Sequence, residues 1–182
     1  MICSPKFKTE STSSAIKELF TMNRFLTKRL LSGIARFKVT GTLDFGNTKA
    51  IQVGQFAEVR HVFEQADVNT FASLCGDNNP IHIDPEQAKH SLFGGTIVHG
   101  IFTSSLFSTI FGRALPGAIY VDQSLVFKRP VHIGKVVLAR IEVLEVKPRK
   151  KGDVLVCSTV CKLADETVVI DGKASVMIPY QP

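Results

Sequence analysis

The sequence predicts an α+β fold in which an antiparallel sheet packs on one buried helix. Three observations predict it. Residues 97–111, "IVHGIFTSSLFSTIF", are apolar on nearly all sides and interleaved with small Ser and Thr, which is typical of a buried helix. Residues 53–63 alternate in side-chain character, as a half-buried strand does. After the break at "LPG", β-branched runs separated by turn residues predict three or four long strands.

The remaining elements follow from cap and turn residues. Asp67 as N-cap and Gly76 as stop predict a helix over residues 67–75. Asp84 is expected to cap a short helix over residues 84–90, with a proline at its first turn. The strands that follow the apolar helix are expected at residues 119–127, 135–147, 153–163 and 167–178.

The first 50 residues differ from the rest of the chain in charge. They hold nine Lys and Arg against three Asp and Glu, whereas residues 51–182 hold thirteen of each, so the whole net charge of +6 lies in this segment. Residues 19–43 contain no acid and place leucines at near-helical spacing among basic residues, which is typical of a mitochondrial transit peptide. A disordered basic tail or a surface helix is the alternative.

We therefore expect two parts in the chain. Residues 1–50 are predicted to be a transit peptide with a loosely ordered linker, and residues 51–182 to be one domain of the mitochondrial matrix. Met22 is an alternative start that would keep most of the targeting signal.

Several function classes are disfavoured by composition. Because the domain is charge-balanced, nucleic-acid binding is not expected, since that needs basic residues clustered on the folded part. The basic run "KPRKK", residues 147–151, is expected to be a solvated hairpin turn, with an acidic partner as the alternative. No membrane span is expected, because the apolar run is shorter than the roughly 20 residues that a span needs. Cys157 and Cys161 are expected to be small buried hydrophobes.

The segment "GDNNPIHID", residues 76–84, is the densest polar stretch of the domain. Asp77 and His82 are five positions apart in a loop bent by Pro80, so their side chains can converge on one water molecule. Asp77 could equally be a turn residue, and His82 a hydrogen-bonded polar histidine. Asn79 is expected to hold the loop, and His99 to bond the loop through its ring.

These residues carry a family resemblance. The segments "FASLCGDNNPIHID", "FGGTIVHG" and "LVFKRPVHIG" resemble the MaoC-like (R)-specific enoyl-thioester hydratase family, which includes (R)-specific enoyl-CoA hydratases and mitochondrial 3-hydroxyacyl-thioester dehydratases of type 2. The resemblance covers residues 53–180. It implies a hot-dog fold, in which a curved antiparallel sheet wraps around a central buried helix, and a homodimer formed side by side through the sheets.

The resemblance also implies site residues. Asp77 and His82 fall on the family's acid–base pair, Gly100 on the backbone donor to the thioester oxygen, and Ser108 on a serine near the pair. Ser108 could equally be a packing serine. The chemistry suits these groups, because hydration needs a base for water and N–H donors for the enolate oxygen. No metal and no cofactor is expected.

The implied function is a hydro-lyase that interconverts (3R)-hydroxyacyl and trans-2-enoyl thioesters. In mitochondria this would be the 3-hydroxyacyl-ACP dehydratase step of fatty acid synthesis, with acyl carrier protein as the carrier. Hydration of CoA thioesters is the alternative carrier assignment. A non-catalytic acyl-binding module would be expected to break the acid–base pair, which is intact here. A thioesterase would need a carboxylate on the central helix, and residues 97–111 contain none.

Overall fold

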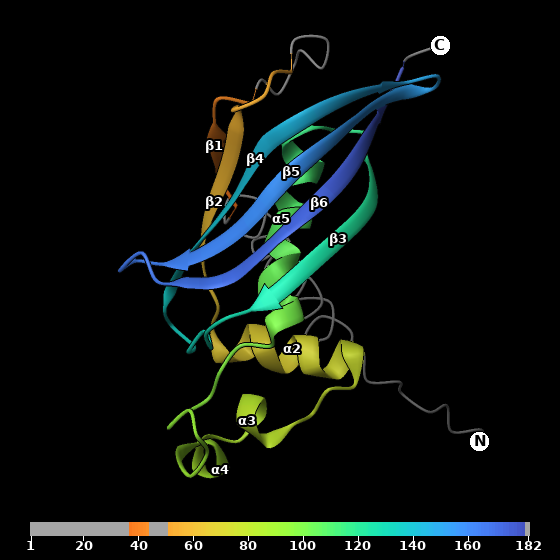
Figure 1. The fold of residues 1–182 in the computed structure, drawn as a ribbon. Coiled ribbons are helices and arrows are strands. Elements are labelled where there is room, and N and C mark those ends of the chain that lie inside the picture. The colour runs from red at the N-terminus through yellow and green to blue at the C-terminus, as the bar shows by residue number, and fades with distance from the viewer. Residues whose placement is uncertain (1–36, 44–50, 181–182) are drawn as a thin grey trace, which may run out of the picture. The chain divides into compact units, whose positions relative to one another are not determined.

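The computed structural model describes residues 37–43 and 51–180. Their elements, in chain order, are β1 (Val39–Gly41), β2 (Phe56–Val62), α2 (Gln65–Cys75), α3 (Pro80–Ile83), α4 (Pro85–Lys89), α5 (Gly100–Ala114), β3 (Ile119–Phe127), β4 (Val136–Arg149), β5 (Gly152–Leu163) and β6 (Val168–Pro179). The six strands form one open antiparallel sheet in the order β1-β2-β4-β5-β6-β3. The sheet curves around α5, and α2, α3 and α4 gather at the N-terminal end of that helix (Figure 1). The predicted α+β architecture is confirmed.

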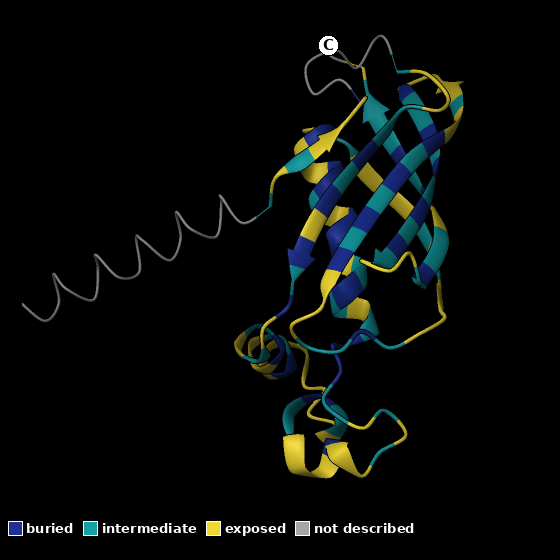
Figure 2. Ribbon diagram, turned by 90° about the vertical axis from the view of Figure 1, so that its left-hand side faces the viewer, coloured by how far each residue is buried: buried dark blue, intermediate teal, exposed yellow. Residues whose placement is uncertain are grey.

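The core lies between α5 and the sheet. Leu106, Phe107, Ile110 and Phe111 of α5 are buried, and buried residues recur along the strands that face the helix (Figure 2). The helix begins at Gly100 rather than at residue 97, because the preceding segment is extended. Residues 97–98 pair with the chain at 131–132, where the Val98 N–H donates to the Val131 carbonyl oxygen at 2.8 Å.

The folded unit includes part of the segment predicted to be presequence or linker. Val39 of β1 pairs with Val59 of β2, and the side chain of Leu43 is only 1% exposed. Gly41 allows this close pairing, because a Cβ there would lie 2.2 Å from the Phe56 carbonyl oxygen. The compact unit therefore begins at Phe37 rather than at residue 51. The predicted targeting signal lies mostly outside the described residues.

Local corrections concern the helices before α5. Glu64, not Asp67, is the N-cap of α2, and Asp67 accepts the Glu64 N–H at 3.0 Å from the third helical position. The prediction chose Asp67 by residue preference and missed this reciprocal capping arrangement. Gly76 ends α2 with φ of 81°, as predicted. The expected loop at 76–84 contains one helical turn, α3, which Asn79 caps by accepting the Ile81 N–H.

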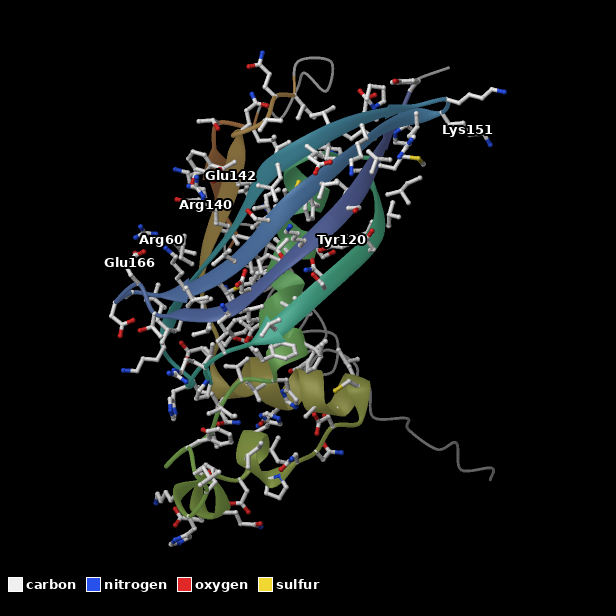
Figure 3. All side chains as sticks on the ribbon, viewed as in Figure 1. Arg60, Tyr120, Arg140, Glu142, Lys151 and Glu166 are labelled. Atoms are coloured by element: carbon white, nitrogen blue, oxygen red, sulfur yellow. The ribbon has the colours of Figure 1, made fainter. Side chains whose placement is uncertain are left out.

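The outer face of the sheet carries charged side chains on β2 and β4. The Arg140 guanidinium lies 3.6 Å from the centre of the Phe56 ring and donates to the carboxylates of Glu58 and Glu142. Figure 3 shows Arg140 and Glu142 beside β2 and β4. The basic run at 147–151 is exposed at the β4–β5 hairpin, where Lys151 lies at the tip, so the hairpin prediction is confirmed. Within the described residues, no helix has the length and apolar character to cross a membrane.

Candidate active site

The segment 76–84 and the start of α5 meet at one end of the sheet (Figure 1). Pro80 begins the single turn α3, which places His82 on the inner side of the loop with 7% of its surface exposed. Its Nδ1 lies 2.8 Å from the carbonyl oxygen of Ile97. Because a carbonyl only accepts, Nδ1 carries a hydrogen, and Nε2 is therefore the nitrogen that is bare in the neutral form of the ring.

Asp77 faces that nitrogen. Gly76 turns the chain in the left-handed region, and the Asp77 Oδ1 accepts the Asn79 N–H at 3.3 Å. Its Oδ2 lies 3.9 Å from the Nε2 of His82, and its side chain is 54% exposed. A separation of 3.9 Å is too long for a direct hydrogen bond but can be bridged by one water molecule that bonds both atoms. The structure therefore brings Asp77 and His82 together as the loop spacing predicted.

His99 completes the cluster. Its ring stacks on that of His82 with centroids 3.8 Å apart and an interplanar angle of 28°. Its Nε2 lies 3.0 Å from the carbonyl oxygen of Asp77, so the ring bonds the loop as predicted. The same nitrogen lies 3.9 Å from the Asp77 Oδ2.

Asp77, His82 and His99 also lie close enough together to be considered as metal ligands. Two features argue against that use. His99 donates from Nε2 to a carbonyl oxygen, so this nitrogen has no free lone pair. The two rings also stack face against face with centroids 3.8 Å apart, whereas a metal ion must lie near the plane of each ring that binds it. The donor set therefore fits an acid–base cluster better than a metal site.

A pocket of about 400 Å³ opens beside His82 and reaches the start of α5. Its wall is mostly apolar and includes Phe93, Ile97, Val98, Ile101, Val131 and Ile170. Gly100 lines it as the first residue of α5, where N–H groups lack partners within the helix and the helix dipole is positive. A Cβ at Gly100 would lie 2.7 Å from the Phe127 ring, so glycine is what this wall accommodates.

The other sequence candidates lie apart from this cluster. Ser108 is exposed on α5, eight residues and therefore about 12 Å along the axis from Gly100. It is not among the residues that line the pocket beside His82. Asp84 caps α4 by accepting the N–H groups of Glu86 and Gln87, as predicted. The hydrogen bond from the Gln87 N–H is the main cause that lowers the pKa of this carboxyl.

Sequence reasoning assigned no site role to Phe127, Lys128 or Arg129. All three line the pocket at the end of β3. Lys128 pairs with Asp171 at 2.8 Å, whereas the guanidinium of Arg129 has no carboxylate partner in the described part of the chain. The proximity of "FKRP" to the loop at 76–84 depends on the sheet order, which no local pattern reveals.

Comparisons with known proteins agree with this geometry. Residues 41–162 match the family model described as a MaoC-like domain. A mitochondrial 3-hydroxyacyl-[acyl-carrier-protein] dehydratase of Arabidopsis thaliana is 38% identical over 130 residues, which cover 71% of this chain and 78% of the relative. An (R)-specific enoyl-CoA hydratase of Aeromonas caviae is 37% identical over 135 residues, which cover 73% of this chain and 99% of the relative.

Solved structures give the same assignment of fold. The (R)-hydratase from A. caviae aligns with a TM-score of 0.68 and 37% identity over 72% of this chain and all of that one. An unliganded R-hydratase from Pseudomonas aeruginosa aligns with a TM-score of 0.69 and 31% identity, covering 79% of this chain and 90% of that one. With these neighbours, the expected hot-dog fold is confirmed.

Proposed function

The chain belongs to the MaoC-like domain family, and on that premise we propose that it is a hydro-lyase interconverting (3R)-hydroxyacyl and trans-2-enoyl thioesters. The observation that carries the proposal is the Asp77 carboxylate placed 3.9 Å from the bare Nε2 of His82, whose ring lines a mostly apolar pocket that reaches the start of α5. The relatives named above are a dehydratase and a hydratase, and the two names describe opposite directions of one reaction.

In the hydration direction, one water molecule binds between Asp77 and His82. The pair removes a proton as the water oxygen bonds to C3 of the enoyl group, and negative charge moves to the thioester oxygen. The Gly100 N–H donates to that oxygen at the positive end of α5. The proton held by the pair then passes to C2, which gives the 3-hydroxyacyl thioester. Dehydration reverses each step with the same groups.

The carrier is proposed to be acyl carrier protein, with CoA as the second candidate, because relatives of both names are similar to this chain. Both carriers present the acyl group on a phosphopantetheine arm. Arg129 lies at the pocket without a carboxylate partner in the described part of the chain, so its charge can meet the phosphate of that arm.

A substrate lacking the phosphate tests this role of Arg129. Arg129→Gln should raise KM several-fold for crotonyl-CoA and crotonyl-acyl carrier protein, and leave turnover of crotonyl-N-acetylcysteamine unchanged. Arg60→Gln, an exposed arginine on β2, is the matched control. Equal effects on all three substrates would contradict the assignment, and the relative kcat/KM of the two carriers decides between them.

We also propose a homodimer that forms through the β3 edge of the sheet. β3 is an edge strand, and it exposes large apolar side chains, namely Ile119, Tyr120, Val121, Val126 and Phe127. Such an edge in a soluble chain is commonly covered, because its unpaired N–H and C=O groups accept another strand. Light scattering during size-exclusion chromatography should give twice the chain mass, and Val121→Lys should shift it toward the monomer.

A location in the mitochondrial matrix is proposed from the acid-free basic segment at residues 19–43, together with mitochondrial relatives. A fluorescent protein that carries residues 1–50 at its N-terminus should accumulate in the matrix. Deletion of residues 1–36 from this fusion should abolish its import.

Purified full-length protein tests the activity itself. We expect crotonyl-CoA and crotonyl-acyl carrier protein to lose their enoyl-thioester absorbance, and chiral analysis to find the (3R) product. A wild-type protein without turnover on either carrier, or one that forms the (3S) product, would refute the proposed function.

A further inference from the structure

His99 occupies a position between the parts of the proposed active site. It is the residue immediately before α5, and only 3% of its surface is exposed. Its ring packs edge-on against Phe71, with centroids 5.1 Å apart, and stacks on His82. Its backbone leads directly into Gly100. One buried side chain therefore touches the acid–base histidine and adjoins the proposed donor residue.

The hydrogen bonding of His99 indicates that the ring serves more than packing. Its Nε2–H donates to the Asp77 carbonyl oxygen at 3.0 Å, so its Nδ1 is a bare acceptor. That Nδ1 is buried and finds no hydrogen-bond partner within residues 37–43 and 51–180. A buried polar atom without a partner is destabilising. Phenylalanine would fill the same stack without this cost, so the Nε2–H is the group that distinguishes histidine here.

We propose that His99 is a positioning residue, whose Nε2–H holds the backbone of Asp77 while its ring fixes the plane of His82. This inference rests on the proposed hydro-lyase function and adds a residue to it. The bond to the Asp77 carbonyl sets where the Asp77 carboxylate lies, and that carboxylate has little other support. Its Oδ1 has one bond, at 3.3 Å, to the Asn79 N–H, and the side chain is half-exposed.

The stack constrains the other partner. His82 is tethered at Nδ1 by the Ile97 carbonyl, and a ring held by one bond can still tilt about it. His99 lies against its face at 3.8 Å and removes that freedom. A water bridge across 3.9 Å tolerates little displacement, and a misplacement of about 1 Å costs roughly 100-fold in rate. The effect of His99 is therefore expected in kcat rather than in substrate binding.

Two substitutions separate the hydrogen bond from the stack. His99→Phe keeps an aromatic ring against His82 and removes the donor, and His99→Gln restores an amide N–H at a similar reach. We expect His99→Phe to lower kcat by roughly 10- to 100-fold, with KM changed less than about three-fold. His99→Gln keeps a donor but loses the stacked ring, so we expect it to recover part of that loss, with a kcat between those of His99→Phe and the wild type. His90→Gln, at the exposed histidine that follows α4, is the control and should match the wild type.

A folded His99→Phe variant with wild-type kcat would overturn the proposal, and so would a rise in KM at unchanged kcat. A kcat for His99→Gln no higher than that of His99→Phe would overturn the role given to the Nε2–H. Absence of turnover in the wild type would refute the proposed function, and this inference with it. Turnover in the wild type with unimpaired His99→Phe would refute this inference alone.

A second measurement does not depend on whether variants fold. Nitrogen-15 NMR of wild-type protein labelled at histidine distinguishes the two neutral tautomers. We expect the hydrogen of His99 on Nε2 and that of His82 on Nδ1, as their carbonyl partners require. A His99 ring with its hydrogen on Nδ1 could not hold the Asp77 carbonyl and would overturn the proposal.

Discussion

Asp77 and Asp84 lie seven residues apart in one loop, and the structure gives them opposite duties. Asp77 faces the Nε2 of His82 across 3.9 Å, whereas Asp84 accepts the N–H groups of Glu86 and Gln87 at 2.9 and 3.0 Å. We therefore predict that Asp77→Asn abolishes most activity with little loss of stability. We predict that Asp84→Ala lowers stability with little loss of activity.

The size of each effect follows from the contacts. A positioned acid–base group contributes roughly 10²- to 10⁴-fold, so Asp77→Asn should lower kcat/KM by that factor. Its side chain is 54% exposed and accepts one long bond, from the Asn79 N–H at 3.3 Å, so the amide oxygen of asparagine can replace it with little loss of stability. Removal of Asp84 leaves first-turn N–H groups of α4 without their cap, which lowers the melting temperature.

The assay pairs initial rates on crotonyl-CoA with thermal unfolding of the same preparations. Wild type, both variants and the double variant are compared at one pH. The crossed pattern is the test, because general damage to the loop would lower rate and stability together. Full turnover by Asp77→Asn, or an equal loss of turnover in Asp84→Ala at unchanged stability, would refute the division of roles.

Two further predictions concern packing and pH. Gly100→Ala would place a methyl 2.7 Å from the half-exposed Phe127 ring, so the ring must move, and we expect a folded protein with kcat/KM reduced about ten-fold or more. The control is Gly95→Ala, whose Cβ would meet its nearest atom at 3.9 Å and which should keep its activity. Equal kcat/KM values for the two variants would contradict this prediction. Burial raises the pKa of Cys157 to about 12 from 9.0, so the folded state keeps a proton that the unfolded state loses. Stability should therefore be complete below about pH 9 and fall toward pH 12, by up to about 1.4 kcal/mol per pH unit for this thiol. Urea unfolding should show a shallower fall for Cys157→Ala but not for the exposed-site control Cys75→Ala, and parallel curves would refute the assignment.

Most of the fold could be predicted because its elements carry strong local patterns. The strand expected at residues 119–127 coincides with β3, and the apolar run at 97–111 overlaps α5. β1 could not be predicted, because three residues hold no periodic signal and their conformation depends on the partner strand β2. The sheet order is equally non-local: β3 follows α5 in the chain but pairs with β6, the last strand. Hydrophobic alternation specifies that a segment is a strand, not which strand it meets.

The candidate site divides in the same way. Asp77 and His82 are near neighbours in sequence, and Pro80 between them makes their approach predictable from the loop alone. Phe127 and Arg129 reach the same pocket only through the pairing of β3 with β6. Ser108 differs from these residues, because it does not line the pocket of its own chain, and its role stays a prediction.

The two stacked histidines show why residue type alone could not assign the chemistry. Each ring is held by one backbone carbonyl, His82 through Nδ1 by Ile97, 15 residues away, and His99 through Nε2 by Asp77, 22 residues away. These opposite attachments leave opposite nitrogens bare. His82 therefore offers an acceptor toward the Asp77 carboxylate, where a water can be deprotonated, while His99 offers a donor already in use. Exchanging the two carbonyl contacts would exchange the bare nitrogens, so the histidine that we propose as the acid–base group is selected by tertiary hydrogen bonds.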